Sequence, residues 1–206
     1  DEGVLLRERG ITMPVVVLNA DADSFDAMAA NRLEPEIYSL RSLHEFAAAV
    51  ERYGEQRYPI HVKLDTGMHR LGFVEEELPA LLDALARCGR TVRVASVFAH
   101  LCTSDEPAQD DFTRLQIARF DRMSSRIAEA LPYPVLRHTA NSAAIERFPE
   151  AQYDMCRLGL GLYGFGFEHN AALRPVSTLR TRIVQIKRLE AGDAVGYGRA
   201  GKLLRP

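Results

Sequence analysis

The sequence has 206 residues, 26 basic and 28 acidic side chains, a formal net charge of −2 and 47% hydrophobic residues. This composition is ordinary for a soluble globular protein, and it excludes a transmembrane helix, a secretory signal and a basic surface for nucleic acid or anionic membranes. The three cysteines are odd in number and widely spaced, which predicts a reducing, cytoplasmic setting and no structural metal site.

Strands and helices are expected to alternate along most of the chain. Short apolar or alternating runs predict about six strands, at 15–18, 36–39, 60–65, 92–101, 135–140 and 155–163. Helical spacing predicts helices between them, at 1–10, 24–31, 42–54, 78–89, 120–131 and 142–147. Ser24 is a candidate N-cap, and Ser42 followed by Glu45 predicts a capping box. The fold class is therefore α/β, a partial (β/α)8 TIM-type barrel with a parallel sheet.

The pattern changes after Pro175. Residues 178–189 alternate as a strand would, a turn is expected at 190–193, and a further strand-like run covers 195–198. We therefore expect an incomplete barrel domain at 1–173 and the beginning of a C-terminal β domain at 174–206.

Polar residues interrupt the strand predicted at 60–65. Strict alternation places His61, Lys63 and Asp65 on one side of it, which in a barrel faces the centre. Arg70 lies in the loop that follows, where enzymes of this architecture hold their active sites. An edge strand with a solvated face is the alternative interpretation.

Further polar groups stand where later strands end. His100 closes one predicted strand, as either a structural or a functional histidine. Ser142 follows another, either as an N-cap or as a phosphate ligand. Arg157 precedes a glycine-rich run that begins at Gly159, and glycines there permit either close approach to an anion or tight packing. Together these residues suggest an anionic, phosphorylated ligand.

Four segments resemble bacterial alanine racemase in order and spacing, namely 63–72, 98–101, 140–144 and 157–164. The resemblance implies a pyridoxal-phosphate enzyme with a (β/α)8 barrel and a C-terminal β domain. It also implies a head-to-tail homodimer that interconverts L- and D-alanine for peptidoglycan in the cell wall.

The resemblance also assigns roles to residues around the cofactor. Arg157 would donate a hydrogen bond to the pyridine nitrogen, and because arginine only donates, that nitrogen would stay unprotonated. The other cofactor-binding positions would be Asn141, Ser142, Gly159, Leu160 and Tyr163, with the phosphate held by Ser142 and by the backbone amides of Gly159 and Leu160.

A second group would serve the substrate side and support catalysis. Arg70 would donate to the phenolic oxygen of the cofactor and approach the substrate carboxylate, and His100 would lie beside Arg157. Lys63 matches a lysine that is often carbamylated in the family, where the carbamate holds the arginine equivalent to Arg70. His69 replaces a glycine that is common at its position.

Two family features have no counterpart in the sequence. The segment that carries the cofactor lysine is absent, and Lys63, Lys187 and Lys202 have other contexts. The motif with the catalytic tyrosine is absent too, and Tyr197 matches an earlier family segment. Because racemisation needs a base on each face of Cα, we expect an internal fragment that is inactive by itself.

Two other functions compete with this one. A single-domain barrel that binds pyridoxal phosphate without catalysis lacks a β domain, so the alternation at 178–189 argues against it. The other alternative is a truncated structural or interaction module, in which the ligand-binding residues would be retained from an ancestor without a function. A racemase of broader specificity is a variant of the first hypothesis.

Overall fold

The computed structural model describes residues 1–170 and 172–205 of the chain. The chain divides into two compact units, Asp1–Arg174 and Pro175–Pro206, and each is described by itself. The assignment of these units to a barrel domain and a β domain remains a prediction.

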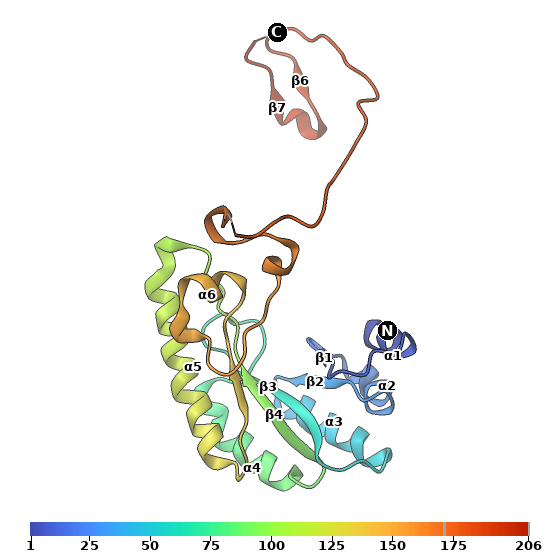
Figure 1. Cartoon of the computed structure of the whole chain (residues 1–206), viewed down its shortest axis with the longest axis vertical. Coiled ribbons are helices and arrows are strands. Elements are labelled where there is room, and N and C mark those ends of the chain that lie inside the picture. The colour runs from blue at the N-terminus through green and yellow to red at the C-terminus, as the bar shows by residue number, and fades with distance from the viewer. Residues whose placement is uncertain (171, 206) are drawn as a thin grey trace. The chain divides into compact units, whose positions relative to one another are not determined.

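The first unit is built on a five-stranded parallel sheet (Figure 1). Its strands pair in chain order, each parallel to the next: β1 (Val16–Val17), β2 (Glu34–Ile37), β3 (Tyr58–Lys63), β4 (Val92–Phe98) and β5 (Leu136–His138). Sequential parallel strands joined by helices are the winding of a (β/α)8 barrel. The fold is thus α/β, as predicted, and the barrel is not closed within the described residues.

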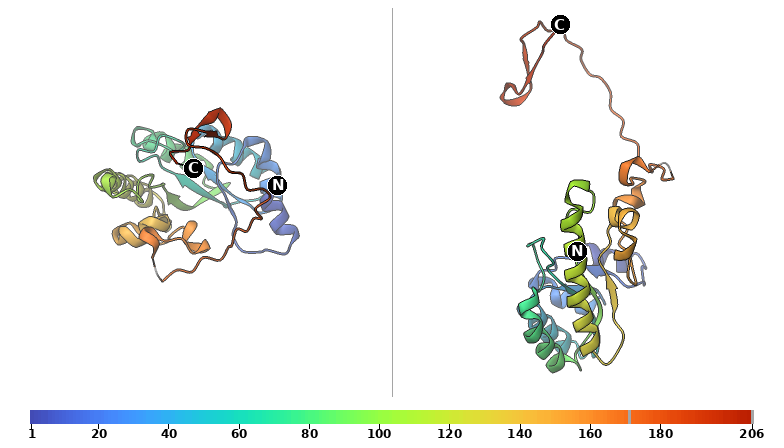
Figure 2. Two further views of the ribbon diagram at one scale, coloured as in Figure 1. Left: turned by 90° about the horizontal axis from the view of Figure 1, so that it is seen from above. Right: turned by 90° about the vertical axis from the view of Figure 1, so that its left-hand side faces the viewer.

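In the described part of the first unit, four helices connect successive strands and cover the outer face of the sheet, one helix precedes the first strand and one follows the fifth (Figure 2). They are α1 (Glu2–Glu8), α2 (Phe25–Ala30), α3 (Leu40–Arg52), α4 (Leu78–Cys88), α5 (Asp110–Ala130) and α6 (Ser142–Arg147). The apolar stripe of α3 is buried as predicted, with Phe46 edge-on to Phe25 and Tyr58. Ile60, Val62 and other sheet residues pack against these helices to form the main core.

The inner face of the sheet is polar and equally buried. Glu36, His61, Lys63, Ser96 and His138 come from four adjacent strands and are each less than 7% exposed. Buried polar groups of this kind must find partners, because an unpaired one costs free energy. These polar side chains form part of the candidate site.

Three local predictions are wrong. The predicted strand at 155–163 is a loop with a 3-10 turn, Leu160–Tyr163, that ends at Gly164 in the left-handed region with φ 85°. The capping box of α3 lies one turn earlier than predicted, since the Ser39 hydroxyl accepts from the Ser42 amide at 3.1 Å. The strand predicted at 36–39 begins at Glu34 and ends at Ile37.

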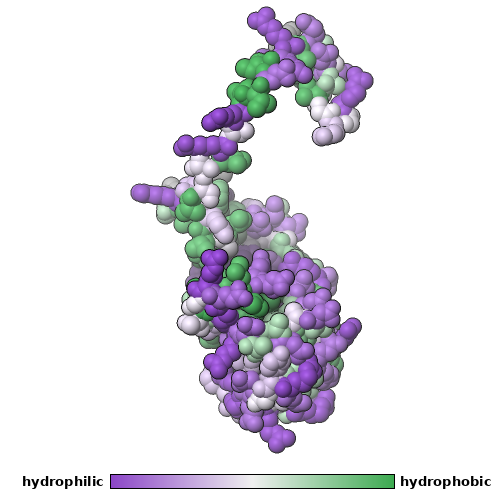
Figure 3. Space-filling view, turned by 90° about the vertical axis from the view of Figure 1, so that its right-hand side faces the viewer, coloured by the Kyte–Doolittle hydropathy of each residue, from purple (hydrophilic) through white to green (hydrophobic). Residues whose placement is uncertain are grey.

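The second unit contains one short antiparallel hairpin. Its strands are β6 (Ala194–Val195) and β7 (Gly201–Lys202), joined through the 3-10 turn Tyr197–Arg199. The strand predicted at 178–189 does not form, and its side chains are exposed, with Leu179 fully so. Figure 3 shows hydrophobic side chains at the surface of both units.

None of the helices in the described part of the chain is both long enough and apolar enough to cross a membrane.

Candidate functional site

Arg157 is fixed at the ends of β4 and β5 by several hydrogen bonds. One terminal nitrogen donates to His138 Nδ1 at 2.8 Å, and the other donates to the carbonyl oxygens of Ala99 at 2.7 Å and Thr139 at 3.2 Å. The second nitrogen also lies 3.4 Å from His100 Nδ1. Both terminal nitrogens are thus engaged, and Nε makes none of these contacts.

A continuous chain of side-chain hydrogen bonds leads from Arg157 across the inner face of the sheet. Its links are His138 Nδ1 at 2.8 Å, His138 Nε2 to Ser96 Oγ at 2.9 Å, Ser96 Oγ to His61 Nδ1 at 2.6 Å, and His61 Nε2 to Glu34 Oε2 at 2.7 Å.

The direction of the first two links follows from Arg157. A guanidinium only donates, so His138 Nδ1 accepts and its Nε2–H donates to Ser96. At the other end, the Glu34 carboxylate only accepts, so His61 Nε2–H donates to it. The Ser96 oxygen lies between the two imidazoles and joins these two ends.

The electrostatics of the site keep His138 and His100 neutral. Burial, with a smaller contribution from Arg157, lowers the pKa of His138 to about 3. Burial and the positive charges of Arg157, Arg70 and Lys63 lower the pKa of His100 to about 4. Burial also lowers the pKa of Arg157 to about 10, which leaves it charged at neutral pH.

The ring of Phe98 supports this cluster from β4. It stacks on His138 with centroids 5.0 Å apart and an interplanar angle of 3°. The Arg157 guanidinium and the Lys63 ammonium both lie over the same ring, at 5.3 Å and 5.7 Å from its centroid. An aromatic face attracts cations, so Phe98 helps to hold both positive charges near the carboxyl end of β4.

Ser142 joins α6 to the glycine-rich turn after Arg157. Its hydroxyl accepts hydrogen bonds from the amides of Gly159 at 2.9 Å and Gly161 at 3.1 Å. A Cβ on Gly161 would lie only 2.6 Å from Leu158 Cδ1, so a side chain there would disturb the turn. The two amides and the hydroxyl form a small polar cradle that we name the Ser142 cradle.

Asn141, rather than Ser142, caps α6. Its Oδ1 accepts from the Ala144 amide at 3.0 Å and from the Ser104 hydroxyl at 2.8 Å, while its Nδ2 donates to the Leu101 carbonyl. The N-cap interpretation of Ser142 is therefore wrong. Asn141 ties the loop after β4 to the start of α6, which positions the Ser142 cradle.

The loop that carries Arg70 is anchored tightly at its base. Asp65 accepts hydrogen bonds from the amides of Gly67 at 2.9 Å and His69 at 3.1 Å, so its side chain serves the loop instead of the sheet face. A Cβ on Gly72, where φ is 129°, would lie 2.6 Å from the Asp65 backbone nitrogen. Arg70 itself is exposed, and its positive charge is one of those that lower the pKa of His100.

Lys63 has a partner that sequence reasoning missed. Its ammonium lies 2.6 Å from Glu36 Oε1, with the two side chains 6% and 0% exposed. The other carboxylate oxygen accepts from the Asn19 amide at 2.6 Å.

The structure therefore brings Lys63, His100, Ser142, Gly159 and Arg157 together. Leu160 and Tyr163 follow Gly159 in the turn with side chains 69% and 56% exposed, so any contact by Leu160 would use its backbone. Four other participants were not predicted: Glu34, Glu36, Ser96 and His138. The alternation of Glu34-Pro-Glu-Ile37 was a signal for the first two, whereas Ser96 and His138 lie inside strand runs without a distinguishing pattern.

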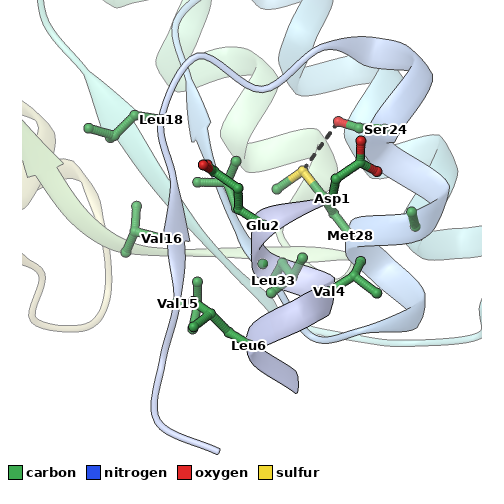
Figure 4. A pocket seen from close by; sticks show the side chains of 13 residues that line it. Asp1, Glu2, Val4, Leu6, Val15, Val16, Leu18, Ser24, Met28 and Leu33 are labelled. Carbon is green, nitrogen blue, oxygen red and sulfur yellow. Dashed lines mark hydrogen bonds between the residues drawn. The ribbon is translucent and has the colours of Figure 1, made fainter. Parts of the chain in front are cut away.

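A separate cavity of about 400 Å³ lies between α1, β1 and α2 (Figure 4). Val15, Val16, Leu18 and other apolar side chains line most of it, with Asp1 and Glu2 at its side. None of the candidate site residues lines this cavity.

Comparison with known proteins identifies the family. The model of the alanine racemase N-terminal domain matches residues 1–166. The chain belongs to the alanine racemase family. The alanine racemase of Symbiobacterium thermophilum is 37% identical over 206 residues, which cover 96% of this chain and 53% of that protein. The chain thus spans about half the length of the curated relatives that it matches.

Solved alanine racemases have the same architecture. The enzyme from Streptomyces coelicolor has a TM-score of 0.84 and 26% identity, covering 99% of this chain and 56% of that one. The enzyme from Bacillus anthracis with bound L-Ala-P has a TM-score of 0.73 and 27% identity, covering 100% of this chain and 54% of that one. The polar inner face of the sheet is therefore set in an alanine racemase fold.

We predict that stability falls with acidity because of His138 and His100. Their pKa values are about 3 and about 4 in the folded state and near 6.5 when unfolded, so the unfolded chain binds protons first. The stabilisation is complete above pH 6.5 and is lost as pH falls through about 4 for His100 and about 3 for His138. The loss is up to about 1.4 kcal/mol per pH unit for His138 and smaller for the more exposed His100. Urea unfolding at a series of pH values measures this slope. His138→Gln should reduce it by about half or more, whereas His44→Gln, on the exposed side of α3, should leave it unchanged.

The hydrogen bond from Arg157 predicts the tautomer of His138. Nitrogen-15 NMR of histidine-labelled protein should show His138 neutral and protonated at Nε2. Ser96→Ala removes the central link, so it should change the imidazole shifts of both His61 and His138 while His44 stays unaffected. A protonated Nδ1 on neutral His138 would contradict the assigned direction.

Proposed function

We propose that this chain forms the cofactor-binding side of an alanine racemase that interconverts L- and D-alanine with pyridoxal 5'-phosphate. The observation that carries the proposal is the fixed Arg157, whose terminal nitrogens are engaged and whose Nε remains for a ring nitrogen. Its setting in an alanine racemase fold supports the choice of reaction.

The residues present fit the proposed cofactor. The Ser142 hydroxyl accepts from the amides of Gly159 and Gly161 and keeps its own proton to donate to a phosphate. Those amides would turn from the hydroxyl to the phosphate when it binds, as glycine-rich turns allow. Arg157 lies in the loop two residues before Gly159, with its guanidinium 5.3 Å from the centroid of the Phe98 ring, and suits a ring nitrogen. Asn141 holds the cradle in place, and the backbone of Leu160 continues the same turn toward Tyr163.

The chemistry of Arg157 favours racemisation over other outcomes. Pyridoxal phosphate, when bound, withdraws electrons from Cα of an amino acid and makes its proton acidic. Arg157 holds the ring nitrogen without protonating it, so electron withdrawal is limited and return of a proton to Cα is favoured. Arg70, from its anchored loop, would bind the substrate carboxylate, and neutral His100 would keep Arg157 oriented.

We further propose that these 206 residues alone do not racemise alanine. The mechanism needs a proton-transferring group on each face of Cα. Lys63 is engaged by Glu36, and the remaining lysines, Lys187 and Lys202, lie in the second unit. The missing groups would come from other segments of an alanine racemase homodimer, in the cytoplasm, where D-alanine is made for peptidoglycan.

A second candidate is a barrel that binds pyridoxal phosphate without catalysis. The observation in its favour is that the cofactor-binding groups are in place while Lys63, the lysine at the site, is paired with Glu36. A cofactor-binding test alone does not separate the two candidates, so exchange at Cα is needed as well.

Cofactor binding tests the proposed site. We expect pyridoxal phosphate to bind the chain, followed by quenching of tyrosine fluorescence or by equilibrium dialysis. Ser142→Ala should weaken binding about tenfold or more, since a hydrogen bond to a charged group contributes about 1.5–3 kcal/mol. The matched control is Ser177→Ala in the second unit, which should bind like the unaltered chain. If Ser142→Ala bound pyridoxal phosphate as tightly as the unaltered chain, the Ser142 cradle would not be part of the cofactor site.

Proton exchange tests the reaction. L-alanine and pyridoxal phosphate are incubated with the chain in D2O, and deuterium at Cα is measured by NMR. We expect no exchange above that of free cofactor for this chain alone, and exchange when the missing segments of the enzyme are supplied. Clear exchange by the chain alone that Lys63→Ala abolishes would show that Lys63 acts as the base.

A further inference from the structure

Glu36 is a fully buried carboxylate in the middle of the candidate site. It lies on β2, beside β3, and is 0% exposed. Its Oε2 accepts a hydrogen bond from the Asn19 amide, and its Oε1 lies 2.6 Å from Lys63 Nζ in an ion pair rather than a well-angled hydrogen bond. A buried charge needs an opposite charge nearby, and Lys63 provides it.

Glu36 offsets an excess of positive charge. Lys63, Arg70 and Arg157 all lower the pKa of His100, so three cations converge on one region. The negative charge of Glu36 raises the pKa of Arg157 against the lowering caused by burial. Glu36 therefore acts on two of the three cations, one by contact and one at longer range.

This pairing conflicts with a carbamate on Lys63. Carbon dioxide reacts only with a neutral amine, whereas an ion pair with a buried carboxylate favours the ammonium form. A carbamate would also replace the cation next to Glu36 by an anion. Two negatively charged groups in direct contact in a buried site do not both remain ionised.

We propose that Glu36 is a positioning residue that keeps Lys63 as an unmodified ammonium ion. Glu36 itself then supplies, as a permanent side chain, the buried negative charge that a lysine carbamate would supply. The meaning of this charge for catalysis rests on the proposed function, whereas the Lys63–Glu36 pair forms without cofactor or substrate.

The proposal predicts a gain of modification when Glu36 loses its charge. In Glu36→Gln, Lys63 stays buried among cations without its counter-ion and gives up its proton more readily. The nitrogen lone pair then attacks the carbon of CO2 and forms a C–N bond, one C–O π bond opens to give the carbamate oxygen anion, and the amine proton goes to water.

Chemical trapping measures this modification directly. The folded chain is equilibrated with 13C-bicarbonate, the carbamate is alkylated with a trialkyloxonium salt, and peptide mass spectrometry assigns the labelled lysine. We expect no adduct on Lys63 in the unaltered chain and roughly tenfold more adduct in Glu36→Gln, because removal of the opposite charge favours the neutral amine. Circular dichroism establishes that each variant is folded.

Two variants serve as controls. Glu34→Gln removes a neighbouring carboxylate on the same strand that pairs with His61 instead, so Lys63 should stay unmodified. Lys63→Ala identifies any signal from the terminal amine or from the other lysines. An adduct on Lys63 in the unaltered chain overturns the proposal, and so does a folded Glu36→Gln that forms none.

A second measurement covers the case in which Glu36→Gln does not fold. Nitrogen-15 NMR of the lysine side chains should resolve a buried, slowly exchanging ammonium group in the unaltered chain. That resonance should disappear in Lys63→Ala and persist in Glu34→Gln. Detection of Lys63 as a neutral amine or a carbamate would overturn the proposal. Neither measurement uses pyridoxal phosphate, so a failure here is distinct from a failure of the proposed function.

Discussion

The inability of an arginine to accept a hydrogen bond organises the interior of this protein. Arg157 donates to His138, which makes His138 a donor to Ser96, and further hydrogen bonds continue through His61 to Glu34. Four neighbouring strands are thereby linked through side chains as well as backbone. The Arg157 guanidinium, which is proposed to meet the cofactor, is thus connected through these hydrogen bonds to the Glu34 carboxylate on β2.

A polar sheet interior is stable only when its groups are paired. Partly satisfied buried networks cost more than apolar packing, so each link in this one matters to its neighbours. Two carboxylates of β2 divide the task, since Glu34 ends the histidine chain and Glu36 neutralises Lys63. The apolar face of the same strands meets the helices, which explains how one sheet supports both a hydrophobic core and a charged site.

Much of the fold was predictable because it depends on local periodicity. The apolar stripe of α3 and the alternation of β3 each identify a buried face directly. The run at 155–163 misled because its alternating glycines and leucines imitate a strand, whereas the glycines allow a turn that meets Ser142. The alternation at 178–189 likewise predicted a strand, and a strand also needs a neighbouring one for its backbone hydrogen bonds.

The sequence by itself determined the α/β class and the order of most elements, and it singled out the candidate site residues Lys63, Arg70, His100, Ser142 and Arg157. These follow from short-range patterns and from motifs that occupy consecutive positions. Only the tertiary structure decided that Lys63 meets Glu36 and that His61, Ser96 and His138 form one chain with Arg157. Such partners lie on different strands and become neighbours only through the pairing of those strands, which no local pattern records.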